Sequence, residues 1–129
     1  MSVRYDSSGY DGGGSNVIKA GFGEFNAPTD ANSLESSSNI QSTSWTCIHV
    51  LCDLGTSISL YENGSLDTPT DTNVSATTSI SNCNSIIIGK GRSGHRWDGN
   101  ISNVKIYNRL LSSTEITQNF NDLKDRYGL

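Results

Sequence analysis

The chain has 129 residues, of which 33% are hydrophobic, and a formal net charge of −4 at pH 7. This length fits one domain with a modest core. The negative charge argues against nucleic-acid binding, because contact with phosphates needs clustered Lys and Arg that displace counterions. No apolar run approaches the ~18 residues of a membrane span, so we expect no membrane insertion, and the start lacks a signal-peptide pattern. Ser, Thr, Asn and Gly dominate, which favours many short strands over a helical bundle.

The N-terminal part combines glycine-rich and polar stretches with one candidate strand. The run SSGYDGGGSN resists regular structure, so residues 1–15 are predicted to be a flexible Gly/Ser-rich arm or linker and residues 16–129 the folded domain. Apolar residues within Asn16 to Phe25 indicate a strand. The following stretch, Asn26 to Thr43, is polar and indicates a loop.

The centre of the chain carries the best strand signals. Trp45 to Leu51 is rich in β-branched and aromatic residues, and Asp53-Leu54-Gly55 has turn chemistry. Ile58 and Leu60 then mark a second strand. Asn63-Gly64 follows it and predicts a tight hairpin, because both turn positions need positive φ.

Three further segments are predicted to be strands. Val74 to Ile80 and Ser85 to Gly89 are separated by polar turn residues, and the run of three isoleucines in the second indicates burial on both faces. In Ile101 to Tyr107, Val104 and Ile106 fall on one face, which is the period of a half-buried strand.

A helix is predicted to close the chain. Ser112 followed by Glu115 forms a capping box, which satisfies backbone donors at a helix start. Ile116, Phe120 and Leu123 then form one apolar stripe. A helix with a single apolar side must lie on another element.

These motifs occur in a recognisable order. The C-terminal part contains W-D-G, I-x-x-V-x-I-Y-N-R, L-S-x-x-E-I and R-Y-G, and the centre contains W-x-x-I-x-V-x-x-D and L-Y-x-N-G. Together they resemble laminin G-like domains of the concanavalin A-like lectin and glucanase superfamily, especially those of phage tail-fibre and other virion proteins. The resemblance implies an all-β, concanavalin A-like jelly-roll β-sandwich of two antiparallel sheets with a short C-terminal α-helix. Before Trp45 the resemblance is poor, so the domain looks short at its N-terminus.

The cysteines indicate a reducing compartment. Cys47 and Cys52 lie at odd separation on one predicted strand, so their side chains point to opposite faces and do not form a disulfide. With Cys83 they are expected to be three reduced thiols. This suits a virion protein made in a host cytoplasm, while an extracellular location is the alternative.

We expect no enzymatic activity and no catalytic residues. Glucanases of this fold carry alternating carboxylates on one strand, E-x-D-x-x-E or E-x-D-x-E, which aim the reacting groups into one cleft. The sequence has no such cluster. Acidic residues are instead scattered through turns, among them Glu24, Glu35, Asp53, Glu62, Asp67, Asp71 and Asp98.

The candidate ligand site is a glycine-rich loop before the last predicted strand. Arg92, His95 and Arg96 are the best candidates for contacting a glycan or a partner protein, because basic side chains and loop flexibility coincide there. Trp97 belongs to the same loop, although packing beneath the sheet edge is favoured for it by the resemblance. His49 forms a possible metal pair with Cys47, but no second cluster completes four ligands, so a structural histidine is favoured.

Calcium is the one cofactor that the resemblance suggests. Some laminin G-like domains bind it through an aspartate, and the candidates here are Asp53, Asp67 and Asp71. Solvated turn acids are the commoner outcome, so no cofactor is expected.

The sequence therefore predicts a non-enzymatic virion surface module, such as a tail-fibre, decoration or adhesion protein, that binds a surface glycan or receptor. The alternative is a carbohydrate-binding accessory domain of a larger cellular enzyme or adhesin. Because the predicted strands are too few for a complete jelly roll, we expect a homo-oligomer or association with other virion subunits, with Ser2 to Phe25 lying against another chain.

Overall fold

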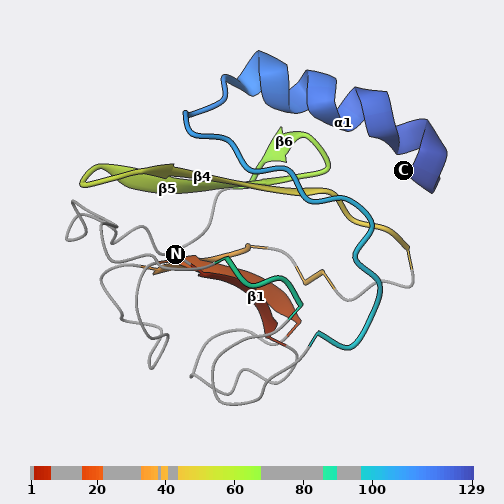
Figure 1. The fold of residues 1–129 in the computed structure, drawn as a ribbon, viewed down its shortest axis with the longest axis horizontal. Coiled ribbons are helices and arrows are strands. Elements are labelled where there is room, and N and C mark those ends of the chain that lie inside the picture. Colours follow the sequence, from red (N-terminus) through yellow and green to blue (C-terminus); the bar gives the residue numbers. More distant parts are fainter. Residues whose placement is uncertain are drawn as a thin grey trace.

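The computed structural model describes residues 2–6, 16–21, 33–37, 39–40, 44–67, 86–89 and 97–129. It is mostly β, with two three-stranded antiparallel sheets and one C-terminal helix, consistent with a concanavalin A-like fold (Figure 1). The elements are β1 (Ser2–Asp6), β2 (Val17–Gly21), β3 (Ser33–Glu35), β4 (Ile48–Asp53), β5 (Ser57–Glu62), β6 (Ser65–Leu66) and α1 (Ser113–Tyr127).

The first sheet has the order β1-β2-β3. Its central strand β2 is buried along its whole length, as expected for a strand paired on both edges. Lys19 is only 4% exposed and forms an ion pair with Glu35, which faces it across the β2–β3 ladder at 3.5 Å. The sequence predicted β2 but missed β3, a three-residue strand inside a polar stretch.

The prediction for the N-terminus was wrong in one respect. Ser2 to Phe25 was predicted to lie against another chain, with residues 1–15 as a flexible arm. Instead β1 pairs with β2 of its own chain from Ser2↔Gly21 to Asp6↔Val17, and Ile18 and Ala20 of β2 belong to the chain's own core. The physical reason is that β2 is buried along its whole length, so both of its edges need a paired strand. The glycine-rich run after β1 led to the prediction of a flexible arm for all of residues 1–15, so the short strand before that run was missed.

The second sheet has the order β4-β5-β6, and its tightest turn was correctly predicted. Asn63 and Gly64 connect β5 to β6 with φ of 49° and 80°. The Asn63 amide oxygen accepts a hydrogen bond from the backbone N–H of Cys47 at 2.9 Å, and the Asn63 N–H donates to the Cys47 carbonyl at 2.8 Å. Asn63 therefore ties the hairpin to the segment that leads into β4.

The hydrophobic core lies between the two sheets. It is formed by residues from β2, β3 and β5, namely Ile18, Ala20, Leu34, Ile58 and Leu60. Leu34 and Leu60 are 2% and 0% exposed. These side chains fill the space between the two sheets, which face each other in Figure 1.

Helix α1 covers the outer face of the second sheet, on the side away from β1 (Figure 1). The predicted capping box is confirmed, with Ser112 accepting from the Glu115 N–H and Glu115 accepting from the Ser112 N–H. Ile116 is fully buried and Phe120 lies against Gly64, so the predicted apolar stripe is the docking side of the helix. No helix in the described part of the chain could span a membrane.

Two predicted strands are not strands in the structure. Residues 101–107 form no ladder with any described strand, and Val104 and Ile106 are 49% and 64% exposed. Residues 86–89 likewise form no ladder, and Ile86 to Ile88 are exposed rather than buried on both faces. Alternating side chains set the period of a strand, but its hydrogen bonds need a partner that periodicity does not specify. The predicted strand Val74 to Ile80 lies outside the described residues.

Candidate binding site

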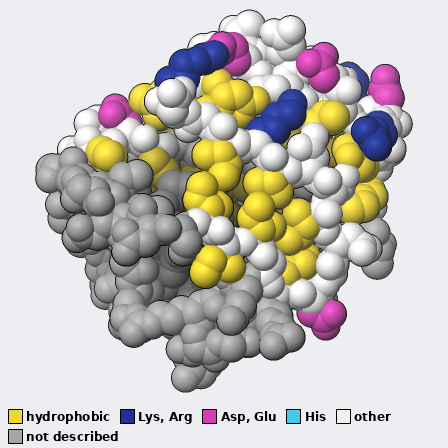
Figure 2. Space-filling model, viewed as in Figure 1, with side chains coloured by type: hydrophobic (Ala, Val, Ile, Leu, Met, Phe, Trp, Pro, Cys, Tyr) yellow, Lys and Arg dark blue, Asp and Glu magenta, His cyan; other side chains and the backbone are white. Residues whose placement is uncertain are grey.

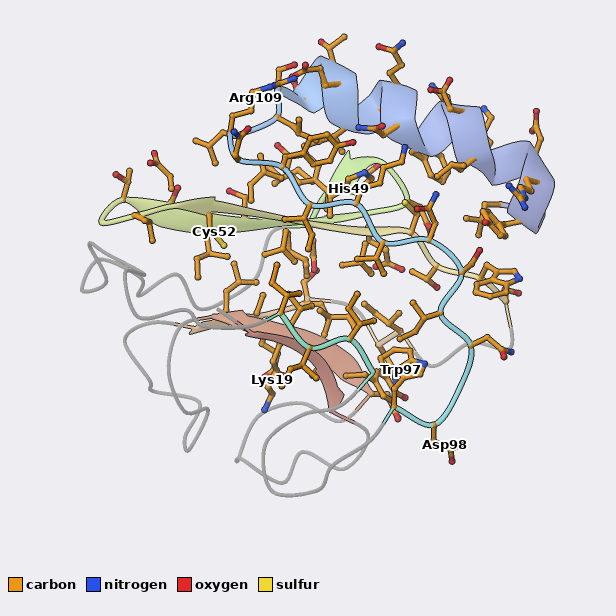
Figure 3. All side chains as sticks on the ribbon, in the orientation of Figure 1. Lys19, His49, Cys52, Trp97, Asp98 and Arg109 are labelled. Atoms are coloured by element: carbon orange, nitrogen blue, oxygen red, sulfur yellow. The ribbon has the colours of Figure 1, made fainter. Side chains whose placement is uncertain are left out.

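Trp97 is the part of the predicted ligand loop that the structure describes (Figure 3). Its indole packs edge-to-face on Tyr5 of β1, with ring centroids 6.1 Å apart and planes at 64°. Tyr5 is itself held by a hydrogen bond from its hydroxyl to the Asn16 amide oxygen at 2.7 Å. Trp97 nevertheless remains 43% exposed. The ring is therefore both packed and accessible, because one edge rests on β1 while part of its surface faces solvent.

The other three predicted ligand residues, Arg92, His95 and Arg96, lie outside the described residues. The structure does fix where their loop ends, because the Trp97 N–H donates to the Gly89 carbonyl at 3.0 Å. Gly89 and Trp97, the residues on either side of residues 90–96, are therefore adjacent.

Two of the three calcium candidates, Asp53 and Asp67, lie within the described residues. Asp53 is exposed at the end of β4, whereas the Asp67 carboxylate accepts hydrogen bonds from the N–H of Ser37, at 2.9 Å, and from the Ser37 hydroxyl. Asp67 thus fastens the end of β6 to the residues after β3. Asp71 lies outside the described residues. Within the described part of the chain, no three His, Cys, Asp or Glu residues group to hold a metal ion.

The carboxylates of the second sheet are far apart. Asp53 pairs with Ser57 at one end of the β4–β5 ladder and Glu62 stands at the other end, so about five strand residues, or about 16 Å, separate them. Glycosidases need two carboxyl groups about 5 to 9.5 Å apart. This hairpin therefore has no such pair along its strands.

Cys47 and His49 lie together, half-buried, with the thiol sulfur 3.9 Å from the His49 Nδ1. Burial raises the pKa of the Cys47 thiol, and burial together with the positive charge of Lys105 lowers the pKa of His49. Both groups are thus held in their neutral forms near pH 7. Cys52 packs against the core on the opposite face, and both Cys47 and Cys52 are free thiols, as the sequence predicted. Cys83 lies outside the described residues.

A polar groove that the sequence did not suggest runs between the segment before α1 and the helix itself. It has a volume of about 250 Å³. The helix contributes Glu115, Gln118, Asn119 and Asp122, and the preceding segment contributes Tyr107, Arg109 and Leu111. The four helix positions follow the spacing i, i+3, i+4 and i+7, so they form one polar stripe beside the apolar one. That spacing could have indicated a polar face on the helix. The sequence near the helix does not show which segment of the chain lies opposite this face.

Hydrogen bonds fix both sides of this groove. The Arg109 guanidinium donates to both Glu115 carboxylate oxygens, at 2.7 and 3.0 Å. The Asn119 amide oxygen accepts from the Lys105 ammonium at 3.1 Å and from the Tyr107 hydroxyl at 3.4 Å. The exposed segment is thereby fastened to the helix by side chains rather than by a ladder.

Comparison with known proteins identifies the fold. The chain matches the family described as the concanavalin A-like lectin/glucanases superfamily over residues 4–117. Its fold is similar to the crystal structure of an S-layer domain-containing protein (residues 221–444) from Clostridium thermocellum, with a TM-score of 0.51 and 19% sequence identity. The likeness covers 82% of this chain and 52% of that one, so this chain spans about half of that structure. No protein with a curated description matches the sequence.

The family match begins within β1, so the resemblance extends further toward the N-terminus than the motifs from Trp45 onward indicated. It covers both sheets and the first turn of α1. On this match, and on two antiparallel sheets enclosing an apolar core, the chain belongs to the concanavalin A-like lectin/glucanase superfamily.

Proposed function

We propose that this protein is a non-enzymatic adhesion module that binds a surface glycan and is displayed on a virion, as a tail-fibre, decoration or adhesion component. One observation carries the proposal. The chain belongs to a superfamily of lectins and glucanases, yet its described β4–β5 hairpin keeps the two carboxylates at opposite ends. A sugar-binding fold without a nearby carboxylate pair fits recognition better than hydrolysis.

The proposed contact surface is the loop that ends at Trp97. Sugar recognition uses an exposed aromatic face together with nearby polar or charged side chains. Trp97 supplies the aromatic surface, and Arg92, His95 and Arg96 precede it in the sequence. We assign the contact to these four residues and propose no cofactor, with calcium at Asp53, Asp67 or Asp71 as the exception to be tested.

A glycan array probed with the whole chain tests the function. We expect binding to one class of polysaccharide or cell-surface glycan, weakened at least about tenfold in Trp97→Ala and largely kept in Trp97→Phe, because the aromatic face survives. The array is repeated with EDTA to test calcium, and we expect no change. An array with no bound glycan would contradict the proposed function.

The alternative setting is a carbohydrate-binding accessory domain of a larger cellular enzyme or adhesin. The likeness to a solved S-layer domain-containing protein from Clostridium thermocellum is the observation in its favour. Antibody labelling separates the two settings: signal on purified particles supports a virion location, whereas signal on cells or in a secreted parent protein supports the alternative. Glycan binding is common to both.

Assembly forms part of the proposal. We propose a jelly-roll sandwich that associates as a homo-oligomer or with other virion subunits. Hydrophobic side chains gather on the face over which residues 97–110 run, where Ile101, Val104 and Ile106 are each at least 45% exposed (Figure 2). Apolar surface of this kind is more often covered than left in water.

A further inference from the structure

We propose that the polar groove between residues 107–111 and α1 is a second binding pocket, which accepts one uncharged sugar ring. It is separate from the Trp97 loop and comes from other elements of the fold. The inference shares its class of ligand with the proposed function but not its site.

The hydrogen-bonding groups of the groove are only partly used. The Asn119 amide oxygen already accepts from Lys105 and Tyr107, so its NH₂ group keeps two donors for a ligand. Gln118 and Asp122 also line the groove, and neither side chain has a hydrogen-bond partner within the described residues. The groove therefore offers amide donors and carboxylate acceptors side by side. Sugar hydroxyls both donate and accept, and they match this combination.

The charges exclude an anion as the preferred occupant. Arg109 is the positive side chain that lines the groove, and its charge is paired with the Glu115 carboxylate, which accepts from two of its three nitrogens. The Lys105 ammonium, outside the lining, donates to Asn119. Asp122 adds a negative charge. A phosphate, sulfate or acidic sugar would meet this carboxylate, while the Arg109 charge is already paired with Glu115. An uncharged hydroxylated ligand avoids this repulsion and still uses the carboxylate as an acceptor.

Size and shape favour a single ring. The volume of about 250 Å³ lies just below the ~300–1,000 Å³ of pockets for drug-sized ligands. Tyr107 lines the groove, and it is 43% exposed. Its ring gives the apolar C–H face of a pyranose a surface to pack on, and Leu111 adds buried apolar surface. We expect weak binding, with a Kd of about 1 to 10 mM, as suits one ring with few contacts.

The test is an NMR titration of the isotope-labelled whole chain with the methyl glycosides of glucose, galactose, mannose and the two common N-acetylhexosamines. We expect at least one of them to shift the side-chain amide signals of Gln118 and Asn119 in a saturable way. Asn119→Ala and Asp122→Asn should each weaken that binding about tenfold.

Two matched variants serve as controls. Asn121→Ala and Asp125→Asn change the same residue types at exposed positions of α1 outside the groove, and they should bind as the parent does. Trp97→Ala should also leave these shifts unchanged while it reduces array binding. If none of the glycosides shifts the two amides, or if the control variants weaken binding as much as the groove variants, the second pocket is excluded. Array binding lost in Trp97→Ala alone would then still support the proposed function.

Discussion

Gly64 stands at the contact between the β5–β6 turn and helix α1, and it satisfies two requirements at once. Its φ of 80° lies in the left-handed region, and a Cβ atom there would be 2.9 Å from the Phe120 ring. We expect Gly64→Ala to lower the free energy of unfolding by about 2 to 4 kcal/mol, because backbone strain and steric overlap add. Chemical denaturation measures this loss.

Gly128 provides the matched control for Gly64. It caps α1 with a similar φ of 70°, but a Cβ atom there would meet nothing within 4 Å. Gly128→Ala therefore tests the backbone strain alone, at about 1 to 2 kcal/mol. Equal losses in the two variants would show that Phe120 does not press on the turn.

Glu115 gives the helix N-terminus a pH dependence. Hydrogen bonds from Arg109, and then from the Ser112 backbone and hydroxyl, lower the pKa of Glu115 to about 2. Because its ordinary value is 4.5, the carboxylate stabilises the folded state above about pH 4.5, and this contribution is lost as the pH falls toward 2. We expect the melting temperatures of the parent and Glu115→Gln to differ at pH 6 and to converge near pH 2.

A carboxyl titration of Glu115 by NMR checks the cause. Arg109→Lys should move its pKa back toward the ordinary value, because a Lys ammonium cannot donate to both carboxylate oxygens in the same planar geometry. A midpoint near 4.5 in the parent protein would mean that the capping box and the ion pair are not formed in solution.

At the scale of elements, α1 depends on its apolar stripe. Ile116 is fully buried beneath the helix. We expect Ile116→Ala to cost about 2 to 5 kcal/mol in a denaturant melt, as do other truncations of buried aliphatic residues. Thr114→Ala, at an exposed position of the same first turn, should change stability by less than about 0.5 kcal/mol. Similar losses in both variants would contradict the docking of this face.

The end of α1 is held by a separate aromatic contact. Tyr127 packs on Trp45, just before β4, with ring centroids 5.3 Å apart, and its hydroxyl is hydrogen-bonded to the Ser102 hydroxyl. Trp45 and Tyr127 belong to two of the motifs by which the sequence resembles its family. Their proximity gives part of that pattern a physical meaning, because Trp45 and Tyr127 are partners in one helix-docking contact.

The features that the sequence predicted to the exact residue are those determined locally. The Asn63-Gly64 turn and the Ser112–Glu115 capping box each involve a few consecutive residues, and both were placed correctly. Strand β1 was missed, and residues 101–107 were wrongly predicted to be a strand, since strand formation depends on a partner distant in the sequence. For the same reason the groove was not foreseen: its two sides meet only after α1 docks.

At the scale of the whole molecule, the exposed apolar residues bear on assembly. Light scattering on the isolated chain should give a mass above the 13.9 kDa of one chain at micromolar concentration. The double variant Val104→Ser, Ile106→Ser should shift the mass toward that of one chain without lowering the melting temperature, because both side chains are exposed. A monomeric parent protein would remove the basis for a homo-oligomer.

The arrangement of the strands also bears on how the chain folds. Each described sheet is built from strands that follow one another in sequence, β1-β2-β3 and then β4-β5-β6, so each ladder forms within a short stretch of chain. The core between them, which contains Leu34 from the first stretch and Leu60 from the second, joins the two stretches. Contacts distant in sequence cost more loop-closure entropy and form more slowly. We therefore expect the packing of one sheet on the other to limit the folding rate, so that the side chains between the sheets govern the folding rate as well as the stability.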